Sequence, residues 1–455
     1  MEQRTKNYFV KSFLAIAIAI GVFFGLKQIL PKNIFTDNKK DSDGIVIDSL
    51  ALAAIADSAM IVDAILPDSI KEDSLANRVH ISISDDSEGL GNLSSFYEKL
   101  YQLETNGKGK VRIAYFGDSM TDGDLIVQDI RQAYQSRYGG KGAGFVGITS
   151  LSASARGTIS HQYSKDWKTQ SCLTVKRPTR PFGIDGQVFF AAPAGTSWVK
   201  YTASNQDNIS MLYNPVLFYG SSGNKDARIR VTTGNKDSVP EYKLNTDRTL
   251  NTCNLGNTGK TLKIAFEKAD SIPFYGVNFD DGKGVHVDNF SIRGNSGLPL
   301  SLYNKSLMNA LDETLNYDLI VLQYGTNVLG YGTSDYSWYE NKMISVVNHL
   351  RNCFPKADIL IVSVGDRAKK VDMDMKSDKA VPPLIKAQRN CAHEVYAGFI
   401  DLQSLMGGDG SMVNWVNEGY ANKDYTHFNA KGARKISTLL YHELDKGYSE
   451  YKKMK

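Results

Sequence analysis

The stretch VRIAYFGDSMTDGD, residues 111–124, joins a short apolar run to a patch of small and acidic residues around Ser119. The apolar run predicts a buried β-strand, and IVQDIRQAYQSRY at 126–138 has the spacing of an amphipathic helix. LSSFYEKLYQLE, residues 93–104, shows helical spacing as well. Ser119 is therefore expected in a strand-to-helix connection, with its N–H pointing into the N-terminal region of the helix, where negative charge is favoured.

The same alternation returns in the last third of the chain. YDLIVLQYG at 317–325 and ADILIVSVG at 357–365 are strand-like. Helical segments are expected from about residue 301, after Asp335, near 384–396 and after Asn429. Strands that alternate with helices predict an α/β fold, with a parallel sheet between two layers of helices.

Between residues 161 and 292 the pattern changes to short β-prone segments separated by Gly, Asn, Asp and Lys. GQVFFAA at 186–192 and GVHVDNFSIRG at 284–294 are examples. This pattern predicts an antiparallel β-sandwich inserted after the first βα unit. Six aromatic residues of this region could stack on sugars or fill the sandwich core: Tyr201, Tyr213, Phe218, Tyr219, Phe274 and Tyr275.

The N-terminal region predicts a membrane anchor and a linker. SFLAIAIAIGVFFGL, residues 12–26, carries no charge, and with its flanks it is long enough to span a bilayer. No clear A-x-A cleavage site follows, so we expect an uncleaved transmembrane helix within residues 1–32, with a cleaved signal peptide as the alternative. Residues 33–92 hold twelve acidic and four basic side chains, which is typical of a solvated acidic linker.

Composition excludes some classes of function. The net charge of +4 is not gathered into a Lys/Arg stripe, which argues against nucleic-acid binding. Seven scattered histidines and four cysteines follow no zinc-ligand spacing, so we expect no metal and no other cofactor. Cys172 and Cys253 could pair in an oxidising compartment or stay as isolated small apolar residues.

Three motifs fall at or after predicted strand ends, where parallel sheets concentrate their chemistry. Ser119 follows the first strand, Asn327 in QYGTN follows the second, and DYTHFNAKG places Asp424 and His427 before the last helix. A carboxylate three residues before a histidine can bend back to one imidazole nitrogen and fix its tautomer. Each motif alone could be a turn or a helix cap, but together and in this order they predict a Ser-His-Asp site.

These motifs resemble the SGNH, or GDSL-like, hydrolases. GDS at 117–119 is similar to their first block, GTN at 325–327 to the third and DYTH at 424–427 to the fifth, while Gly294 in VDNFSIRGNSG matches the glycine of the second. An insert between the first and second blocks is similar to peptidoglycan O-acetylesterases, which carry a carbohydrate-binding-module-like sandwich there. MGGDGSMVNWV at 406–416 also resembles a stretch of those enzymes.

The resemblance implies a role for each residue. Ser119 would be the nucleophile, His427 its general base and Asp424 the residue that orients His427. The N–H groups of Ser119 and Gly294, with the side-chain amide of Asn327, would form the oxyanion hole.

The N-terminal pattern and this resemblance, which covers about residues 93–450, together divide the chain into an anchor, a linker and an interrupted catalytic domain. The expected boundaries are 1–32 for the anchor, 33–92 for the linker, 93–160 and 293–455 for the two parts of the SGNH domain, and 161–292 for the sandwich. This chain departs from the family pattern at Met120, where these esterases commonly have a histidine.

The implied function is a serine esterase that removes O-acetyl groups from a cell-envelope polysaccharide, with peptidoglycan as the first choice. The enzyme would be anchored in the inner membrane with its catalytic domain in the periplasm, or secreted if the N-terminal segment is cleaved. One alternative is an O-acetyltransferase of the same fold that receives acetyl groups from a membrane-bound acyltransferase. Another is a glycan-binding protein without activity.

Overall fold

The computed structural model describes residues 50–51, 89–234, 240–256, 258–331 and 334–455. The expected transmembrane helix at 1–32 and nearly all of the expected linker lie outside these residues. None of the helices in the described ranges is both long enough and apolar enough to cross a bilayer.

A five-stranded parallel sheet forms the centre of the α/β domain. In spatial order its strands are β13 (Gly284–Ser291), β1 (Lys110–Gly117), β14 (Leu319–Gln323), β15 (Asp358–Val362) and β18 (Gly398–Ile400). Successive side chains of a strand point to opposite faces, and both faces of this sheet are buried. In β1, Ile113 and Tyr115 pack in one hydrophobic core, whereas Ala114 and Phe116 pack in the other.

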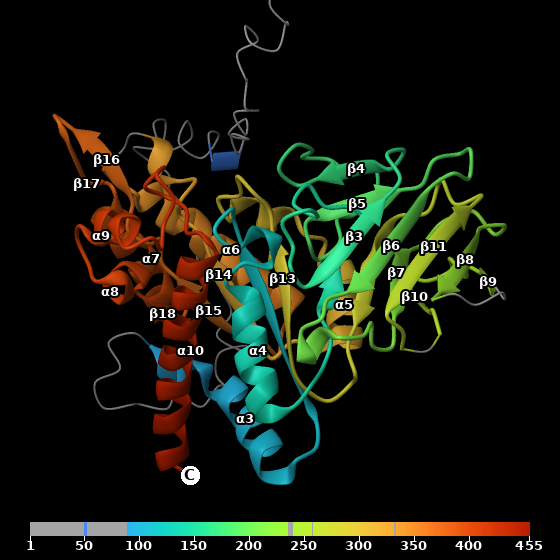
Figure 1. The fold of residues 1–455 in the computed structure, drawn as a ribbon, viewed down its shortest axis with the longest axis horizontal. Coiled ribbons are helices and arrows are strands. Elements are labelled where there is room, and N and C mark those ends of the chain that lie inside the picture. Colours follow the sequence, from blue (N-terminus) through green and yellow to red (C-terminus); the bar gives the residue numbers. More distant parts are fainter. Residues whose placement is uncertain (1–49, 52–88, 235–239, 257, 332–333) are drawn as a thin grey trace, which may run out of the picture. The chain divides into compact units, whose positions relative to one another are not determined.

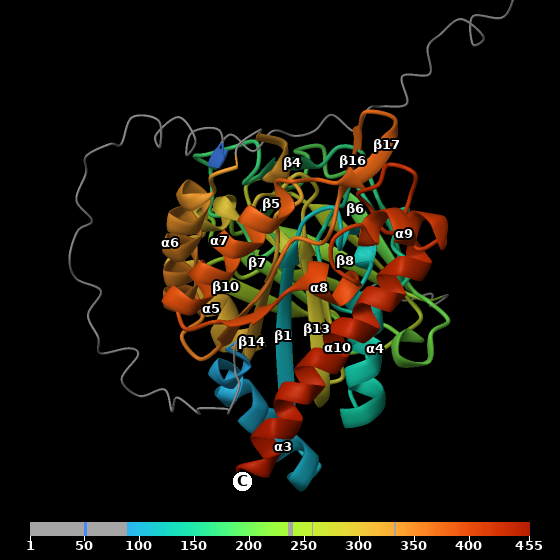
Figure 2. The same ribbon diagram turned by 90° about the vertical axis from the view of Figure 1, so that its left-hand side faces the viewer.

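Helices cover the sheet on both sides, as Figure 2 shows. One layer consists of α3 (Ser94–Asn106), α4 (Val127–Tyr138) and α10 (Ala430–Lys453), and the other of α5 (Lys305–Leu315), α6 (Ser337–Cys353) and α7 (Val381–Glu394). The predicted three-layer α/β/α domain with a parallel sheet is therefore confirmed.

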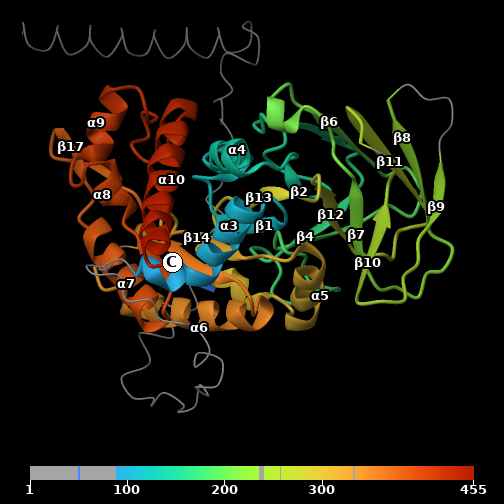
Figure 3. The same ribbon diagram turned by 90° about the horizontal axis from the view of Figure 1, so that it is seen from below.

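Two antiparallel sheets lie beside the β13 edge of this domain (Figures 1 and 3). One has the order β10 (Leu250–Asn254), β7 (Val216–Gly220), β12 (Phe274–Phe279), β5 (Gln187–Phe190) and β4 (Lys168–Ser171), with β2 (Gly144–Val146) also paired to β12. The other has the order β3 (Ile159–Tyr163), β6 (Trp198–Ala203), β11 (Thr261–Glu267), β8 (Arg228–Thr233) and β9 (Glu241–Lys243). Side chains from both sheets share one hydrophobic core.

Most of the aromatic residues singled out in this region are core residues and not exposed sugar platforms. Their exposed fractions are 2% or less for Tyr201, Phe218, Tyr219, Phe274 and Tyr275, whereas Tyr213 is half-buried. The four cysteines are free thiols. Cys172 belongs to the core on the side of the central sheet that α5, α6 and α7 cover. Cys253 packs against the core of the antiparallel sheets.

The segment 284–294 does not join the antiparallel sheets as expected. Its strand β13 pairs in parallel with β1 along the whole of that strand and so forms an edge of the central sheet. A buried charge pair holds this edge, because Arg112 Nε in β1 donates to Asp288 Oδ2 in β13 at 2.7 Å and both side chains are fully buried. Conversely β2, which was assigned to the first part of the α/β domain, pairs with β12.

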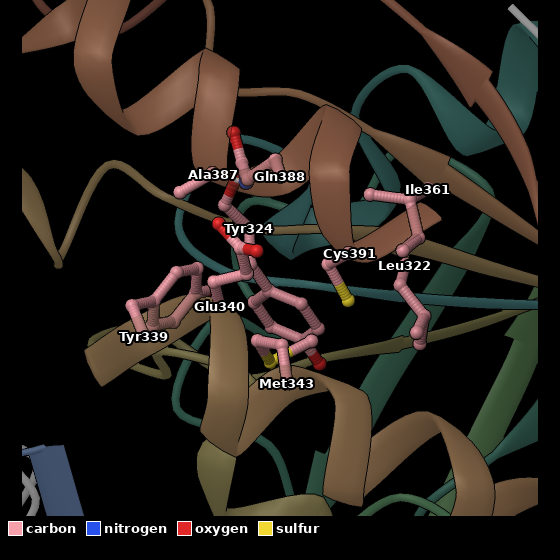
Figure 4. Close-up of a pocket in the computed structure, with 9 residues that line it drawn as sticks. All are labelled: Leu322, Tyr324, Tyr339, Glu340, Met343, Ile361, Ala387, Gln388 and Cys391. Carbon is pink, nitrogen blue, oxygen red and sulfur yellow. Dashed lines mark hydrogen bonds between the residues drawn. The ribbon is translucent and has the colours of Figure 1, made fainter. Parts of the chain in front are cut away.

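A small cavity of about 10 Å³ lies under the sheet between α6 and α7, and Figure 4 shows the side chains that line it. That volume is about what one water molecule requires. The Gln388 amide beside it is already engaged, since Oε1 accepts from Val364 N at 2.9 Å and Nε2 donates to Tyr324 O at 2.8 Å. This cavity is therefore a packing feature of the core.

Candidate active site

Ser119 lies in a tight turn at the carboxyl end of β1. The strand ends at Gly117, where an added Cβ would come within 2.2 Å of Thr121 Oγ1, so only glycine fits. A 3-10 turn, η4 (Asp122–Asp124), follows, and α4 begins only at Val127. The expectation that the Ser119 N–H points into the N-terminus of the next helix is therefore wrong, because η4 and its flanking turns separate the two.

The structure brings Ser119, His427 and Asp424 into one hydrogen-bonded chain. Ser119 Oγ lies 2.8 Å from His427 Nε2, and His427 Nδ1 lies 2.9 Å from Asp424 Oδ2. A proton on Nδ1 is donated to the carboxylate, which leaves the Nε2 lone pair for the serine hydroxyl. Burial alone would raise the pKa of Asp424, but hydrogen bonds from His427 and from the Thr426 N–H outweigh it and lower that pKa to about 2. Asp424 is therefore a carboxylate at any physiological pH.

The segment that follows Asp424 is fixed at both ends. Tyr425 O accepts a hydrogen bond from Ala368 N at 3.0 Å. Downstream, the Asn429 side chain caps α10 by accepting from Lys431 N at 3.0 Å. Tyr425 itself has φ 55°, a conformation that a non-glycine residue holds only where its surroundings impose it. These contacts set the position of the histidine without help from a ligand.

The Asn327 side chain joins the Ser119 turn to the loop that carries Gly294. Its Nδ2 lies 3.2 Å from Asp118 Oδ2, next to Ser119, and 3.1 Å from the carbonyl oxygen of Asn295, next to Gly294. The structure thus brings together all three predicted oxyanion-hole segments. Both amide hydrogens of Asn327 face acceptors of the protein, however, so its donation to a ligand would replace one of these contacts.

Unlike the Asn327 amide, the backbone N–H groups of the site have no acceptor within the described residues. Within the described residues, neither the N–H of Ser119 nor that of Gly294 donates a hydrogen bond. Gly294 has φ 83°, in the left-handed region that favours glycine. Buried or half-buried N–H groups are normally paired, so two open donors on the loops that Asn327 joins are suited to bind an acceptor from outside the protein.

Asp118 is a residue that the sequence analysis did not single out. It is 1% exposed and accepts hydrogen bonds from Met120 N at 2.9 Å, from the Thr326 side chain and from Asn327. Burial raises the pKa of Asp118 to about 6, although these hydrogen bonds and the charge of His427 oppose the shift. Its place directly before the serine was the only signal for it in the sequence.

Further contacts hold the Ser119 turn against β13. Asp124 forms a two-point ion pair with Arg131 of α4, at 2.8 and 3.0 Å, and accepts from Thr158 Oγ1 at 2.6 Å. The hydroxyls of Thr121 and Ser291 lie 2.6 Å apart. The pKa of Asp124 lies well below its usual range, because the charges of its arginine partners outweigh its burial. The turn therefore keeps its shape through buried, charge-assisted bonds.

In the described part of the chain, no group of three or more His, Cys, Asp or Glu side chains is arranged to hold a metal ion. The chemistry that the site can perform with its own groups is nucleophilic. A serine paired to an oriented histidine, next to open N–H donors, is the arrangement of an acyl-transfer site.

The fold and this constellation resemble those of α/β acylhydrolases with a Ser-His-Asp triad. The model of the GDSL-like lipase/acylhydrolase family matches residues 261–435, a span that includes Gly294, Asn327, Asp424 and His427 but begins after Ser119. Residues 261–435 of the chain thus match the GDSL-like lipase/acylhydrolase family, and the fold resembles that of a peptidoglycan O-acetylesterase.

One solved structure has a similar fold. A peptidoglycan O-acetylesterase superposes with a TM-score of 0.65 at 24% identity, covering 78% of this chain and 96% of its own. A family two carbohydrate esterase from Cellvibrio japonicus gives a TM-score of 0.26 at 10% identity, covering 64% of this chain and 99% of its own. None of the curated proteins matches the sequence.

Proposed function

We propose that this protein is an O-acetylesterase that removes acetyl groups from the peptidoglycan of the cell envelope. It would act outside the cytoplasm, anchored by residues 1–32. The observation that carries the proposal is the chain of hydrogen bonds from Ser119 through His427 to Asp424, at 2.8 and 2.9 Å. The fold likeness to a peptidoglycan O-acetylesterase supports the choice of substrate.

In the first half of the reaction, Ser119 Oγ attacks the acetyl carbonyl carbon while His427 Nε2 takes the hydroxyl proton. The N–H groups of Ser119 and Gly294 receive the oxyanion, and Asn327 is the third donor. The bond between the carbonyl carbon and the sugar oxygen then breaks, and His427 returns its proton to that oxygen. The products of this half are the free sugar hydroxyl and acetyl-Ser119.

In the second half, water attacks acetyl-Ser119 with His427 as the base, which releases acetate and restores the serine. Hydrolysis is favoured over transfer to a sugar because the site is open to solvent. The side chains of His427 and Asp424 are 33% and 49% exposed, so water reaches the pair that must activate it.

The test is acetate release from O-acetylated peptidoglycan by the full chain, with Ser119→Ala and His427→Ala as controls. We expect acetate from the wild-type protein and none above background from either variant. Acetyl groups that move to an added glycan acceptor without free acetate would establish the transferase instead. If the variants match the wild type, the proposed function fails.

A further inference from the structure

A cleft of about 60 Å³ lies between the turn that follows Ser119 and the antiparallel sheets. Asp122 from that turn, Ser291 from the end of β13 and Asp185, which precedes β5, all line it. Ser291 leads into the loop of Gly294, so the cleft shares walls with two segments of the candidate active site. Its volume is several times what one water molecule needs, which leaves room for a substituent of a bound substrate.

One wall of the cleft presents a carboxylate oxygen without a hydrogen-bond donor. The Asp122 side chain is only 10% exposed, and its Oδ1 accepts from Ser152 Oγ at 2.5 Å. Its Oδ2 is buried and has no hydrogen-bond partner in the described part of the chain; the closest cation is Arg293 Nη1 at 3.7 Å. Burial is also the main reason that the pKa of Asp122 is raised. A buried acceptor left in this state can gain a hydrogen bond from a ligand.

A second buried carboxyl group, that of Asp185, also lines the cleft. Asp185 is 8% exposed, and its Oδ1 accepts from Gln187 N at 3.1 Å. No basic side chain of the described residues forms an ion pair with it, and burial raises the pKa of Asp185 to about 7. Gly147 allows the chain to pass close to this group, since a Cβ there would lie 2.8 Å from Asp185 Oδ2.

The composition of the cleft indicates which ligand fits. The carboxyl groups of Asp122 and Asp185 both offer acceptor oxygens, which suits a ligand that donates through hydroxyl or amide groups. Phe145 and Phe290 add apolar surface suited to a methyl group. A metal ion is disfavoured because the guanidinium of Arg156, itself paired with Asp124 at 3.4 Å, also lines the cleft. An acetamido sugar offers hydroxyls, an N–H and a methyl group together.

We propose that this cleft is a subsite that receives the acetamido group and an adjoining hydroxyl of the N-acetylated sugar next to the acetylated one, with Asp122 and Asp185 accepting their hydrogens. The inference rests on the proposed function for its choice of glycan. It assigns to the antiparallel sheets a direct part in holding the substrate, through Asp185.

Binding tests the subsite without catalysis. The full chain carrying Ser119→Ala is titrated with the N-acetylglucosamine trimer by isothermal calorimetry. We expect saturable binding at one site, weakened at least tenfold by Asp185→Asn, which puts an N–H donor where an acceptor stood. Gly147→Ala should weaken it as well, because the added methyl group would lie 2.8 Å from Asp185 Oδ2 and must displace that carboxyl group without changing its chemistry. Asp247→Asn is the matched control, since Asp247 is an exposed carboxylate away from the cleft that pairs with Lys225.

The outcomes separate the two proposals. If the trimer does not bind, or binds equally to all variants, the subsite is overturned, whatever the esterase assay shows. If the variants lose binding as expected but wild-type protein releases no acetate from peptidoglycan, the subsite stands and the proposed function fails. Where acetate is released, kcat/KM on O-acetylated glycan should fall about tenfold more than kcat/KM on 4-nitrophenyl acetate in Asp185→Asn and Gly147→Ala. Equal losses on both esters would also contradict a sugar subsite.

Discussion

The Asn327 side chain donates to the carboxylate of Asp118 at 3.2 Å, and this bond ties the loop after β14 to the residue that precedes the candidate nucleophile. The same amide group reaches Asn295 O at 3.1 Å on the loop of Gly294. One side chain therefore sets the spacing of three strand ends around Ser119. The geometry of the site depends on these contacts as much as on the triad itself.

Asn327→Ala should lower kcat on an acetyl ester by about 10²- to 10³-fold, which is the usual cost of removing one oxyanion donor. Tm should fall only modestly, because the substitution removes two hydrogen bonds between loops, to Asp118 and Asn295, at a typical net cost of about 1 kcal/mol each. Steady-state kinetics and thermal unfolding measure the two effects.

Asn309→Ala is the matched control for that prediction. Asn309 Nδ2 also donates to two carbonyl oxygens, those of Asn352 at 3.0 Å and Cys353 at 2.8 Å, but away from the site. Its loss should leave kcat unchanged. Equal kinetic losses in both variants would mean that Asn327 acts only through stability.

The buried Asp118 should make stability depend on pH. Because its pKa is raised to about 6 from 3.8, the folded state holds a proton between these values that the unfolded state has lost. The unfolding free energy therefore falls as pH rises, because the folded state binds the proton more tightly than the unfolded state does. Asp118 contributes about 2 to 3 kcal/mol less to stability once the pH has risen through about 6. Urea unfolding of wild type and Asp118→Asn at pH 4 and pH 7.5 should show this loss in the wild type alone. A constant difference between the two proteins would contradict the assignment.

Arg112 should be a main support of the β1–β13 edge. It is fully buried and bonded to Asp288 and Asp280, so Arg112→Met leaves the buried carboxylate of Asp288 without its ion-pair partner and should cost about 3 to 5 kcal/mol in unfolding free energy. Arg228→Met removes a half-exposed ion pair with Glu241 and should cost at most about 1 kcal/mol. Denaturant titration measures both losses of unfolding free energy. Similar losses would show that the buried ion pairs of Arg112 stabilise the fold no more than an exposed ion pair does.

The turn after β1 should not tolerate a side chain at Gly117. The methyl group in Gly117→Ala would meet Thr121 Oγ1 at 2.2 Å, and overpacking of this kind typically costs about 1 to 3 kcal/mol. Ser119 would be displaced with the turn, so kcat/KM should fall together with Tm. Gly330→Ala, where nothing lies within 4 Å of the added atom, should change neither. A fully active Gly117→Ala protein would contradict the role given to this turn.

The sequence predicted the α/β layers, because buried strands and amphipathic helices leave periodic patterns that can be read locally. It also pointed to Ser119, Asn327, Asp424 and His427, since each follows or precedes a recognisable element. It misplaced the segment 284–294, because a strand that is buried on both faces has no periodicity to tell a parallel from an antiparallel partner. The ion pair between Arg112 of β1 and Asp288 of β13 holds the two strands side by side, and it joins residues far apart in the chain.

Contacts between distant loops could not be predicted from the sequence for a similar reason. Asp118 and Asn327 stand more than two hundred positions apart, and only the register of β1 and β14 brings them together. The carboxylates of Asp122 and Asp185 face one cleft only because the antiparallel sheets lie against the β13 edge. Asp118, Asp122 and Asp185 each look like an ordinary loop aspartate in the sequence.

The central claim is that Ser119 is a nucleophile activated by His427, and covalent labelling tests it most directly. The full chain is treated with a fluorophosphonate that reacts with activated serines, and the adduct is mapped by mass spectrometry of peptides. The account predicts one adduct, on Ser119, absent from Ser119→Ala and formed far more slowly in His427→Ala. An adduct on another residue, or no adduct on a folded wild-type protein, would contradict it.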